Sequence, residues 1–257
     1  MRIVVKVGTS TLTHGTGRIN IRRIEKLCKI LSDIKNAGNE LILVSSGAIG
    51  MGVGKLNMET KPEDMPTKQA AAAIGQCELM YLYDKLFREY NHIVAQMLIT
   101  GLDFSNEESH RNFQSTLNRL LELNAIPIIN ENDTIATQEI SVGDNDTMGA
   151  IVAINAGADL LIILSDIDGL YTDDPHDNPD AQLIDTVFSI TPEIANLAGN
   201  KGSELATGGM ITKIHAAEMS MEAGIDMIIA NGSHPELLYK ILDGEKVGTK
   251  FIGRKKA

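Results

Sequence analysis

Apolar runs of strand length alternate with amphipathic helical patterns along most of this chain, and that alternation limits the folds open to it. Helical spacing of apolar residues is clearest over residues 21–34, 67–90, 113–121 and 211–223. The buried strand candidates lie at residues 3–7, 41–44, 93–99, 126–129, 160–164 and 226–230. Strands separated by helices run parallel, so the pattern predicts a mainly parallel sheet with helices on both faces.

The composition is that of a globular protein. Of the 257 residues 43% are apolar, which argues against disorder and allows a sizeable core. No apolar run approaches the roughly 20 residues of a membrane-spanning helix. Lys6 interrupts a first apolar run that is too short for a signal peptide. Cys28 and Cys77, both in helical segments, are expected to be buried free thiols in a reducing compartment. We therefore expect a cytoplasmic protein.

The formal net charge of −11 argues against nucleic acid and acidic membrane surfaces as partners. An acidic protein can still bind an anion where local donors overcome the global charge. Such a site would have to be built from a few placed lysines and backbone N–H groups.

Four polar clusters fall at the carboxyl ends of predicted strands, and that edge is where open α/β sheets bind ligands. One polar strand end means little, but four on one edge indicate a site. The clusters are residues 6–8, 45–47, 130–133 and 165–166.

The familiar nucleotide-binding loops are absent from the sequence. Residues 47–56 resemble a P-loop, but Ile49 stands where the first glycine belongs and Leu56 replaces the Ser/Thr after Lys55. No G-x-G-x-x-G closes the first strand–helix turn. GDNDTMG at residues 143–149 lacks the alternating ligands of a calcium loop. A nucleotide site must therefore use another design.

Two lysines are candidates for binding phosphate. Lys6 lies in a strand expected to be buried on both faces; it either meets an anion over the Gly8 turn or, on an edge strand, points to solvent. Lys213 follows the Gly208-Gly209 turn by about one helical turn and faces back toward it, unless the loop is simply flexible and the lysine lies on the surface.

Two further turns allow either a ligand or ordinary structure. Gly47, directly after a strand, permits close approach of a carboxylate or phosphate, or it belongs to a simple capped turn. Ser165, Asp166, Gly169 and Tyr171 could line a nucleoside pocket, although Asp-x-Asp-Gly is also common turn chemistry.

Taken together, the motifs resemble the amino acid kinase family, and within it the glutamate 5-kinases. The resemblance spans nearly the whole chain in the expected order, and NENDT followed by VGDND is its most specific part. The motifs are VVKVGTSTL (4–12), VSSGAIGMG (44–52), NENDT (130–134), VGDNDTMGA (142–150), SDIDGLYTDDP (165–175) and ATGGMITK (206–213).

The resemblance implies one three-layer αβα sandwich with a sheet of about eight strands. A lobe of about residues 1–158 would bind glutamate, and a lobe of about residues 159–257 would bind ATP. The implied reaction moves the γ-phosphoryl of ATP to the side-chain carboxylate of L-glutamate, the first step of proline biosynthesis. Mg²⁺ would arrive on the ATP phosphates, so no protein metal ligands are expected.

The family pattern also assigns residues to the reaction. Lys6 and Lys213 would stabilise charge on the moving phosphoryl, with Asp146 between them. Among the substrate-binding residues, Ser46 and Gly47 would take a carboxylate, Asp133 the ammonium, and Asn145 a further hydrogen bond. The ATP-binding residues would be Lys6, Gly8, Ser165, Asp166, Thr207, Gly208, Gly209, Met210 and Lys213.

Other activities of the same fold are the alternatives. An N-acetylglutamate kinase has no need of an acid opposite an ammonium, whereas an aspartate kinase does, so NENDT and VGDND are what favour glutamate. A non-catalytic amino acid sensor would be expected to lose one of the lysines. The family further implies a homo-oligomer and feedback inhibition by L-proline. Because the chain stops soon after residues 247–251, we expect a short form without a C-terminal PUA domain.

GDNDTMG is also a candidate helix start, because an apolar helical pattern begins at Thr147. A capped start would fix Asn145 toward the substrate and Asp146 toward the lysines. The sequence leaves open whether Asp144 contacts ligand or only closes the turn.

Overall fold

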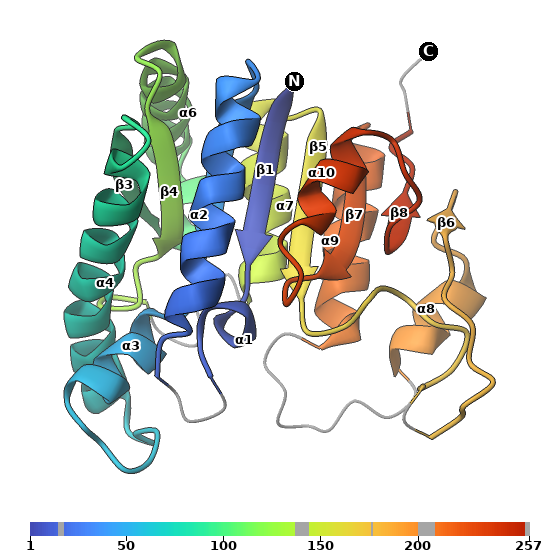
Figure 1. Ribbon diagram of the computed structural model, residues 1–257, viewed down its shortest axis with the longest axis horizontal. Helices are drawn as coiled ribbons and strands as arrows, with labels where there is room; N and C mark the ends of the chain where they lie inside the picture. The colour runs from blue at the N-terminus through green and yellow to red at the C-terminus, as the bar shows by residue number, and fades with distance from the viewer. Residues whose placement is uncertain (15–17, 137–143, 176, 200–208, 255–257) are drawn as a thin grey trace.

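A computed structural model describes residues 1–14, 18–136, 144–175, 177–199 and 209–254 of the chain. Its centre is an eight-stranded sheet of order β3-β4-β2-β1-β5-β7-β8-β6, in which β8 runs antiparallel to β7 and the other pairs are parallel (Figure 1). The strands are β1 Arg2–Val7, β2 Glu40–Ser45, β3 Val94–Ile99, β4 Ile126–Glu131, β5 Leu160–Ser165, β6 Thr186–Val187, β7 Asp226–Asn231 and β8 Thr249–Phe251. The predicted mainly parallel sheet of about eight strands is confirmed.

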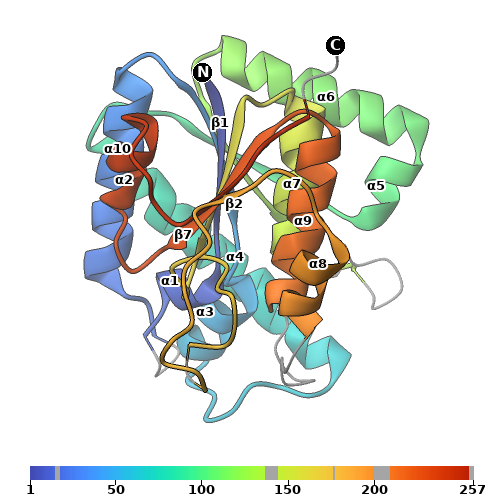
Figure 2. The same cartoon turned by 90° about the vertical axis from the view of Figure 1, so that its right-hand side faces the viewer.

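Helices cover both faces of this sheet, which gives the three predicted layers. In Figure 2, α2 and α10 lie on one side of the strands, and α6, α7 and α9 lie on the other. The helices are α1 Thr9–Leu12, α2 Ile21–Asn36, α3 Ala48–Lys55, α4 Met65–Arg88, α5 Gly101–Ser105, α6 Glu107–Glu122, α7 Asn145–Ala156, α8 Pro192–Gly199, α9 Met210–Glu222 and α10 Leu237–Leu242.

The alternation of side chains along β1 divides the core into two. Ile3, Val5 and Val7 pack in a cluster with apolar side chains of α2, α4 and α10. Val4 packs in the other cluster, with side chains of α6, α7 and α9. Lys6 has the parity of Val4, so its side chain leaves the sheet on the side of α7 and α9.

Capping residues in the sequence predicted the ends of the longer helices well. The Asn20 side chain accepts a hydrogen bond from the backbone N–H of Arg23 and begins α2, as predicted. Gly38, just beyond the end of that helix, has φ of +91°, a conformation that glycine adopts without strain. Helix α4 starts slightly earlier than expected, where the Asp64 side chain accepts from the N–H of Thr67.

The pattern did not predict the short elements near the carboxyl half of the chain. Strands β6 and β8 have two and three residues, which is too short for a period-2 pattern to emerge. They form because Val187 and Phe251 are buried in one core cluster, a contact between residues far apart in the sequence. Helices α8 and α10, of eight and six residues, were likewise not expected.

The glycine run after β2 forms a helix that packs closely on α4. A Cβ atom on Gly52 would lie 1.8 Å from the backbone oxygen of Ala71, and one on Gly75 would lie 1.8 Å from that of Ala48. Only glycine fits at either position, so these two residues are explained by backbone packing and not by a phosphate. The resemblance of this segment to a P-loop is thus accounted for by helix–helix contact.

The two cysteines differ in environment. Cys28 is buried in α2, and its burial raises the pKa of the thiol. Cys77 is exposed on α4, so the expectation of two buried thiols was wrong for Cys77. Since a long helix has one face away from the sheet, a cysteine in it need not be in the core. Among the described residues, no helix is both long and apolar enough to cross a membrane.

Candidate active site

The polar clusters predicted at strand ends do meet at one edge of the sheet. In Figure 1 the arrowheads of β1 and β5 point to the lower end, where α1 and α3 lie. Val7, the last residue of β1, pairs with Ser45 of β2 and Leu164 of β5, so the segments that follow these strands start side by side. This is the carboxyl edge at which parallel sheets bind ligands.

Lys6 lies in the centre of the sheet and not at its edge. Strand β1 is flanked by β2 and β5, and Lys6 is 7% exposed, so the alternative of a solvent-facing lysine on an edge strand was wrong. Helix α7 passes directly over the Lys6 stem: a Cβ on Gly149 would lie 3.4 Å from the Cβ of Lys6. The ammonium is thereby directed along the sheet toward the carboxyl edge.

Lys6, Asp146 and Lys213 form one buried charged cluster. The Nζ of Lys6 lies 2.6 Å from Oδ1 of Asp146, and the Nζ of Lys213 donates to Oδ2 at 3.1 Å. Thr212 Oγ1 also donates to Oδ2, at 3.0 Å. Burial by itself would raise the pKa of Asp146, but the two ammonium groups outweigh it and hold that pKa below its ordinary value. The carboxylate is therefore charged at neutral pH.

The stretch GDNDTMG does begin a helix. Asp144 is the N-cap of α7, and its side chain accepts from the backbone N–H groups of Asp146 at 2.6 Å and Thr147 at 2.9 Å. Its second oxygen accepts from the hydroxyl of Thr147. The helix starts at Asn145, two residues before the apolar pattern does. In this structure Asp144 closes the turn, and the cap fixes Asp146 in the first turn of the helix.

Asn145 reaches across to the segment after β2. Its Nδ2 donates to Oγ of Ser46 at 2.5 Å, joining residues 99 positions apart. Ser46 is buried, and the next residue, Gly47, has φ of +97° and is the N-cap of α3. Ser46, Gly47 and Asn145, three of the predicted substrate-binding residues, therefore lie together. They adjoin the charged cluster, because Asn145 directly precedes Asp146.

The fourth, Asp133, lines a cavity of about 400 Å³ between α4 and the ends of β3 and β4. Ala48, the first residue of α3, lines the same cavity, which connects it to the Gly47 turn. Burial raises the pKa of Asp133 to about 6, and the neighbouring charge of Glu131 adds to the effect. A ligand ammonium is the group that would favour the ionised form of this carboxyl.

The described residues predicted to bind ATP lie in and after β1, at the end of β5 and in the first turn of α9. Ser165 is buried at the end of β5 and donates to the exposed Asp166 at 3.1 Å. Gly209 is the N-cap of α9, and its carbonyl oxygen lies 2.8 Å from Thr212 Oγ1, so this carbonyl and Asp146 share the one hydroxyl proton of Thr212. Met210 opens α9 and packs partly against the core, and Gly8 follows β1. Thr207 and Gly208 lie outside the described residues.

Three polar contacts of this edge were not assigned from the sequence. Thr212 lay within the motif ATGGMITK and could have been found by its place one residue before Lys213. Asn130, in NENDT, donates through Nδ2 to Oε1 of Gln76 at 2.8 Å. Asn231, the last residue of β7, donates at 2.7 Å to Asp168 in the segment that follows β5. The last two join distant segments, and no local pattern signals them.

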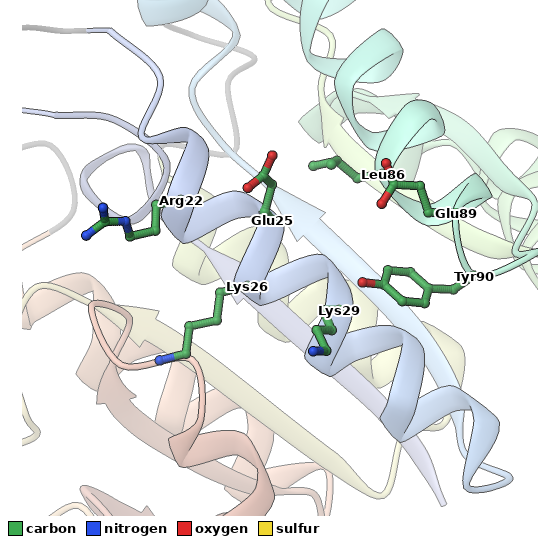
Figure 3. Close-up of a pocket in the computed structure, with 7 residues that line it drawn as sticks. All are labelled: Arg22, Glu25, Lys26, Lys29, Leu86, Glu89 and Tyr90. Atoms are coloured by element: carbon green, nitrogen blue, oxygen red, sulfur yellow. The ribbon is translucent and has the colours of Figure 1, made fainter.

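A second cavity, of about 420 Å³, lies between α2 and α4 (Figure 3). Its lining includes Arg22, Lys26 and Lys29 but also Glu25 and Glu89, so it carries no single sign of charge. Lys26 is already paired with Glu236 at 2.5 Å. No residue predicted for catalysis or binding lines it, and the carboxyl edge remains the candidate active site.

Within the described ranges, no group of three or more His, Cys, Asp or Glu residues is placed to hold a metal ion. Both carboxylate oxygens of Asp146 contact an ammonium, and Asp144 caps a helix. These two acidic groups are thus engaged with donors of the chain.

Comparisons with known proteins show which proteins this chain is similar to. The chain is 54% identical to "Glutamate 5-kinase" of Clostridium perfringens, over 99% of this chain and 96% of that protein. It is 51% identical to "Glutamate 5-kinase" of Caldanaerobacter subterraneus, over 99% of this chain and 68% of that protein. The fold matches a carbamate kinase of Giardia lamblia bound to AMP-PNP, with a TM-score of 0.69, 17% identity and 98% of each chain covered. The description "Amino acid kinase family" matches residues 1–231. The chain belongs to the amino acid kinase family, and within it groups with the glutamate 5-kinases.

Proposed function

We propose that this chain transfers the γ-phosphoryl group of ATP to the side-chain carboxylate of L-glutamate, giving glutamyl 5-phosphate, the first step of proline biosynthesis. The main observation that supports the proposal is the buried cluster of Lys6, Asp146 and Lys213. The hydrogen-bonded pair of Asn145 and Ser46 lies next to it, since Asn145 and Asp146 are adjacent in the chain. The similarity to glutamate 5-kinases over nearly the whole chain supports the choice of substrate.

The chemistry fits what the site contains. The acceptor carboxylate has an ordinary pKa of about 4.3, so at neutral pH it is already the nucleophile and needs no general base. What opposes the reaction is repulsion between that anion and a polyphosphate. Lys6 and Lys213 supply two positive charges in a buried setting, where they act strongly on charge that moves between acceptor and donor.

Asp146 acts on this reaction through the lysines. Two ammonium groups held close together repel each other, and the carboxylate between them offsets that repulsion. Thr212 and the Asp144 cap hold the carboxylate itself in place. Asp146 is therefore a positioning residue, whereas Lys6 and Lys213 are the groups expected to touch the phosphoryl.

Each of the two lobes would bind one of the two substrates. Glutamate would bind within about residues 1–158, with a carboxylate at Ser46 and Gly47 and the ammonium at Asp133. ATP would bind within about residues 159–257, together with Lys6 and Gly8. Mg²⁺ would reach the site on the phosphate oxygens, since Asp144 and Asp146 are engaged elsewhere. A cytoplasmic location, a homo-oligomer and inhibition by L-proline also belong to this proposal.

Trapping with hydroxylamine tests the proposed activity. Acyl phosphates react with hydroxylamine to give hydroxamates, so the chain with ATP, Mg²⁺ and L-glutamate should give γ-glutamyl hydroxamate, while L-aspartate and N-acetyl-L-glutamate should give little. A non-catalytic sensor would give no hydroxamate with any of them. Product from aspartate but not from glutamate would contradict the proposal.

Asp133 predicts a pH dependence of glutamate binding. Because the pKa of Asp133 is about 6, the wild-type KM for glutamate should rise as pH falls below that value and the carboxylate is lost, by up to about tenfold per pH unit. Asp133→Asn should raise that KM by roughly 10- to 100-fold at pH 7.5, which corresponds to losing a charge-assisted contact.

The KM for ATP is the internal control, because Asp133 lines a cavity whose lining includes none of the residues predicted to bind ATP. It should stay within about twofold in the variant. Below pH 6 the two proteins should converge, since protonated aspartic acid and asparagine are both neutral. A variant that kept the wild-type KM, or the same pH dependence, would remove Asp133 from ammonium binding.

A further inference from the structure

Gln76 is a buried polar side chain in the wall of the cavity that Asp133 lines. It lies in α4 and is 8% exposed. Its Oε1 accepts from Asn130, but its Nε2 has no hydrogen-bond partner among the residues that the structure describes. Nearly all buried donors in proteins are paired, and an unpaired one next to a cavity indicates a missing acceptor.

The orientation of the Gln76 amide is set by its neighbours. The backbone N–H of Glu131 donates to Oδ1 of Asn130 at 2.9 Å, which identifies the oxygen of that side chain. Asn130 must therefore present Nδ2 to Gln76, and at 2.8 Å the facing atom of Gln76 has to be its oxygen. A reversed Gln76 amide would put two NH₂ groups against each other. The donor end of Gln76 is thus fixed away from Asn130.

None of the described residues supplies an acceptor for this donor, and a ligand bound in the cavity is one group that would. The cavity wall also contains Glu131 and Asp133, and Asn132 accepts from Thr134. Acidic groups attract a ligand cation but repel a ligand carboxylate. A carboxylate entering this cavity would need a neutral donor, and the Gln76 amide is a buried one.

We propose that Gln76 Nε2 donates to the α-carboxylate of the bound amino acid and makes this residue a determinant of substrate specificity. The inference rests on the proposed function, in which the substrate ammonium faces Asp133. In an α-amino acid the ammonium and the α-carboxylate are bonded to the same carbon, so placing one in the cavity brings the other with it. The side-chain carboxylate then extends past Ala48 toward Ser46 and Lys6.

The test compares L-glutamate with its α-amide, isoglutamine, in which the α-carboxylate is a neutral amide and the reacting carboxylate is unchanged. The measurement is the ratio of kcat/KM for the two substrates. In Gln76→Leu, which removes the donor at similar volume, the preference for glutamate should fall by roughly tenfold or more. In Gln76→Glu the donor becomes an acceptor, which repels a carboxylate and accepts from an amide, so the ratio should fall further.

The ratio does not depend on how much of a variant is folded, since both substrates meet the same enzyme. Gln114→Leu on α6 is the matched control and should leave the ratio unchanged. Equal loss with both substrates in the Gln76 variants would overturn the inference and leave Gln76 as a structural residue. Failure of the wild-type protein to form hydroxamate from glutamate would instead overturn the proposed function.

Discussion

Lys213→Met should abolish phosphoryl transfer while glutamate still binds. Buried groups that stabilise the transferring phosphoryl contribute roughly 10²- to 10⁵-fold in kcat, and methionine fills a similar volume without the charge. Glutamate is expected to contact Ser46, Asn145 and Asp133, all on other elements, so its dissociation constant should change by less than about threefold. Single-turnover kinetics and calorimetric titration with glutamate measure the two quantities.

The fold should tolerate this change. The cluster of Lys6, Asp146 and Lys213 has two positive charges and one negative charge, a net +1. Removing Lys213 leaves Asp146 paired with Lys6, which is neutral. A neutral buried pair is less costly than a net charge, so the midpoint of thermal unfolding should stay within a few degrees.

Lys240→Met, at an exposed position of α10, is the control and should retain full activity. Retained turnover in Lys213→Met would remove Lys213 from the mechanism. Loss of activity together with loss of the folded state would mean that Lys213 is needed for the structure instead.

Asp146→Asn should lose activity for a different reason and should also destabilise the protein. The substitution keeps the shape of the side chain but leaves two buried ammonium groups without a counter-charge, a net +2. Uncompensated buried charge costs roughly 3–5 kcal/mol of unfolding free energy. We expect kcat to fall by about 10²-fold or more, because neither lysine is held toward the phosphoryl.

The pH dependence of this loss has a definite sign. The pKa of Asp146 is lower in the folded chain than its ordinary value of 3.8, so the ionised carboxylate stabilises the fold above that pH. As pH falls from about 4 through the folded pKa, that stabilisation is lost in the wild type. The difference in unfolding free energy between wild type and Asp146→Asn should therefore be full at pH 7 and shrink below pH 4.

Urea unfolding at several pH values measures this difference, with Asp243→Asn at an exposed position as the matched control. The two variants form a contrast, since Lys213→Met neutralises the cluster and Asp146→Asn doubles its net charge. Equal stability of the two would show that the charge balance of the cluster does not govern the fold.

The fold could be predicted where the pattern is local and long. The strands of the sheet centre are apolar runs between helices, and caps such as Asn20 and Asp144 mark helix starts by their own side chains. The short strands β6 and β8 could not be predicted, because two or three residues carry no period. They form only through burial of Val187 and Phe251 against the rest of the core.

The glycines of residues 47–56 show that a local motif does not explain every residue in it. The sequence excludes a P-loop by spacing, but it offers no reason for Gly52. That reason is the backbone of α4, which approaches so closely that a Cβ would overlap Ala71. The partner of this contact lies on another helix, and nothing in the local sequence of α3 specifies it.

The sequence by itself determined the alternating architecture and the polar carboxyl edge of the sheet, because periodicity is a property of short segments. The two lysines were candidates from their places in the predicted elements, and the aspartate was a candidate from the family resemblance alone. Only the tertiary structure decided that both lysines meet one carboxylate, and that Gln76, whose Nε2 has no partner among the described residues, lines the cavity of Asp133. Those pairings join segments up to 207 residues apart, from Lys6 to Lys213, and depend on distances that packing alone fixes.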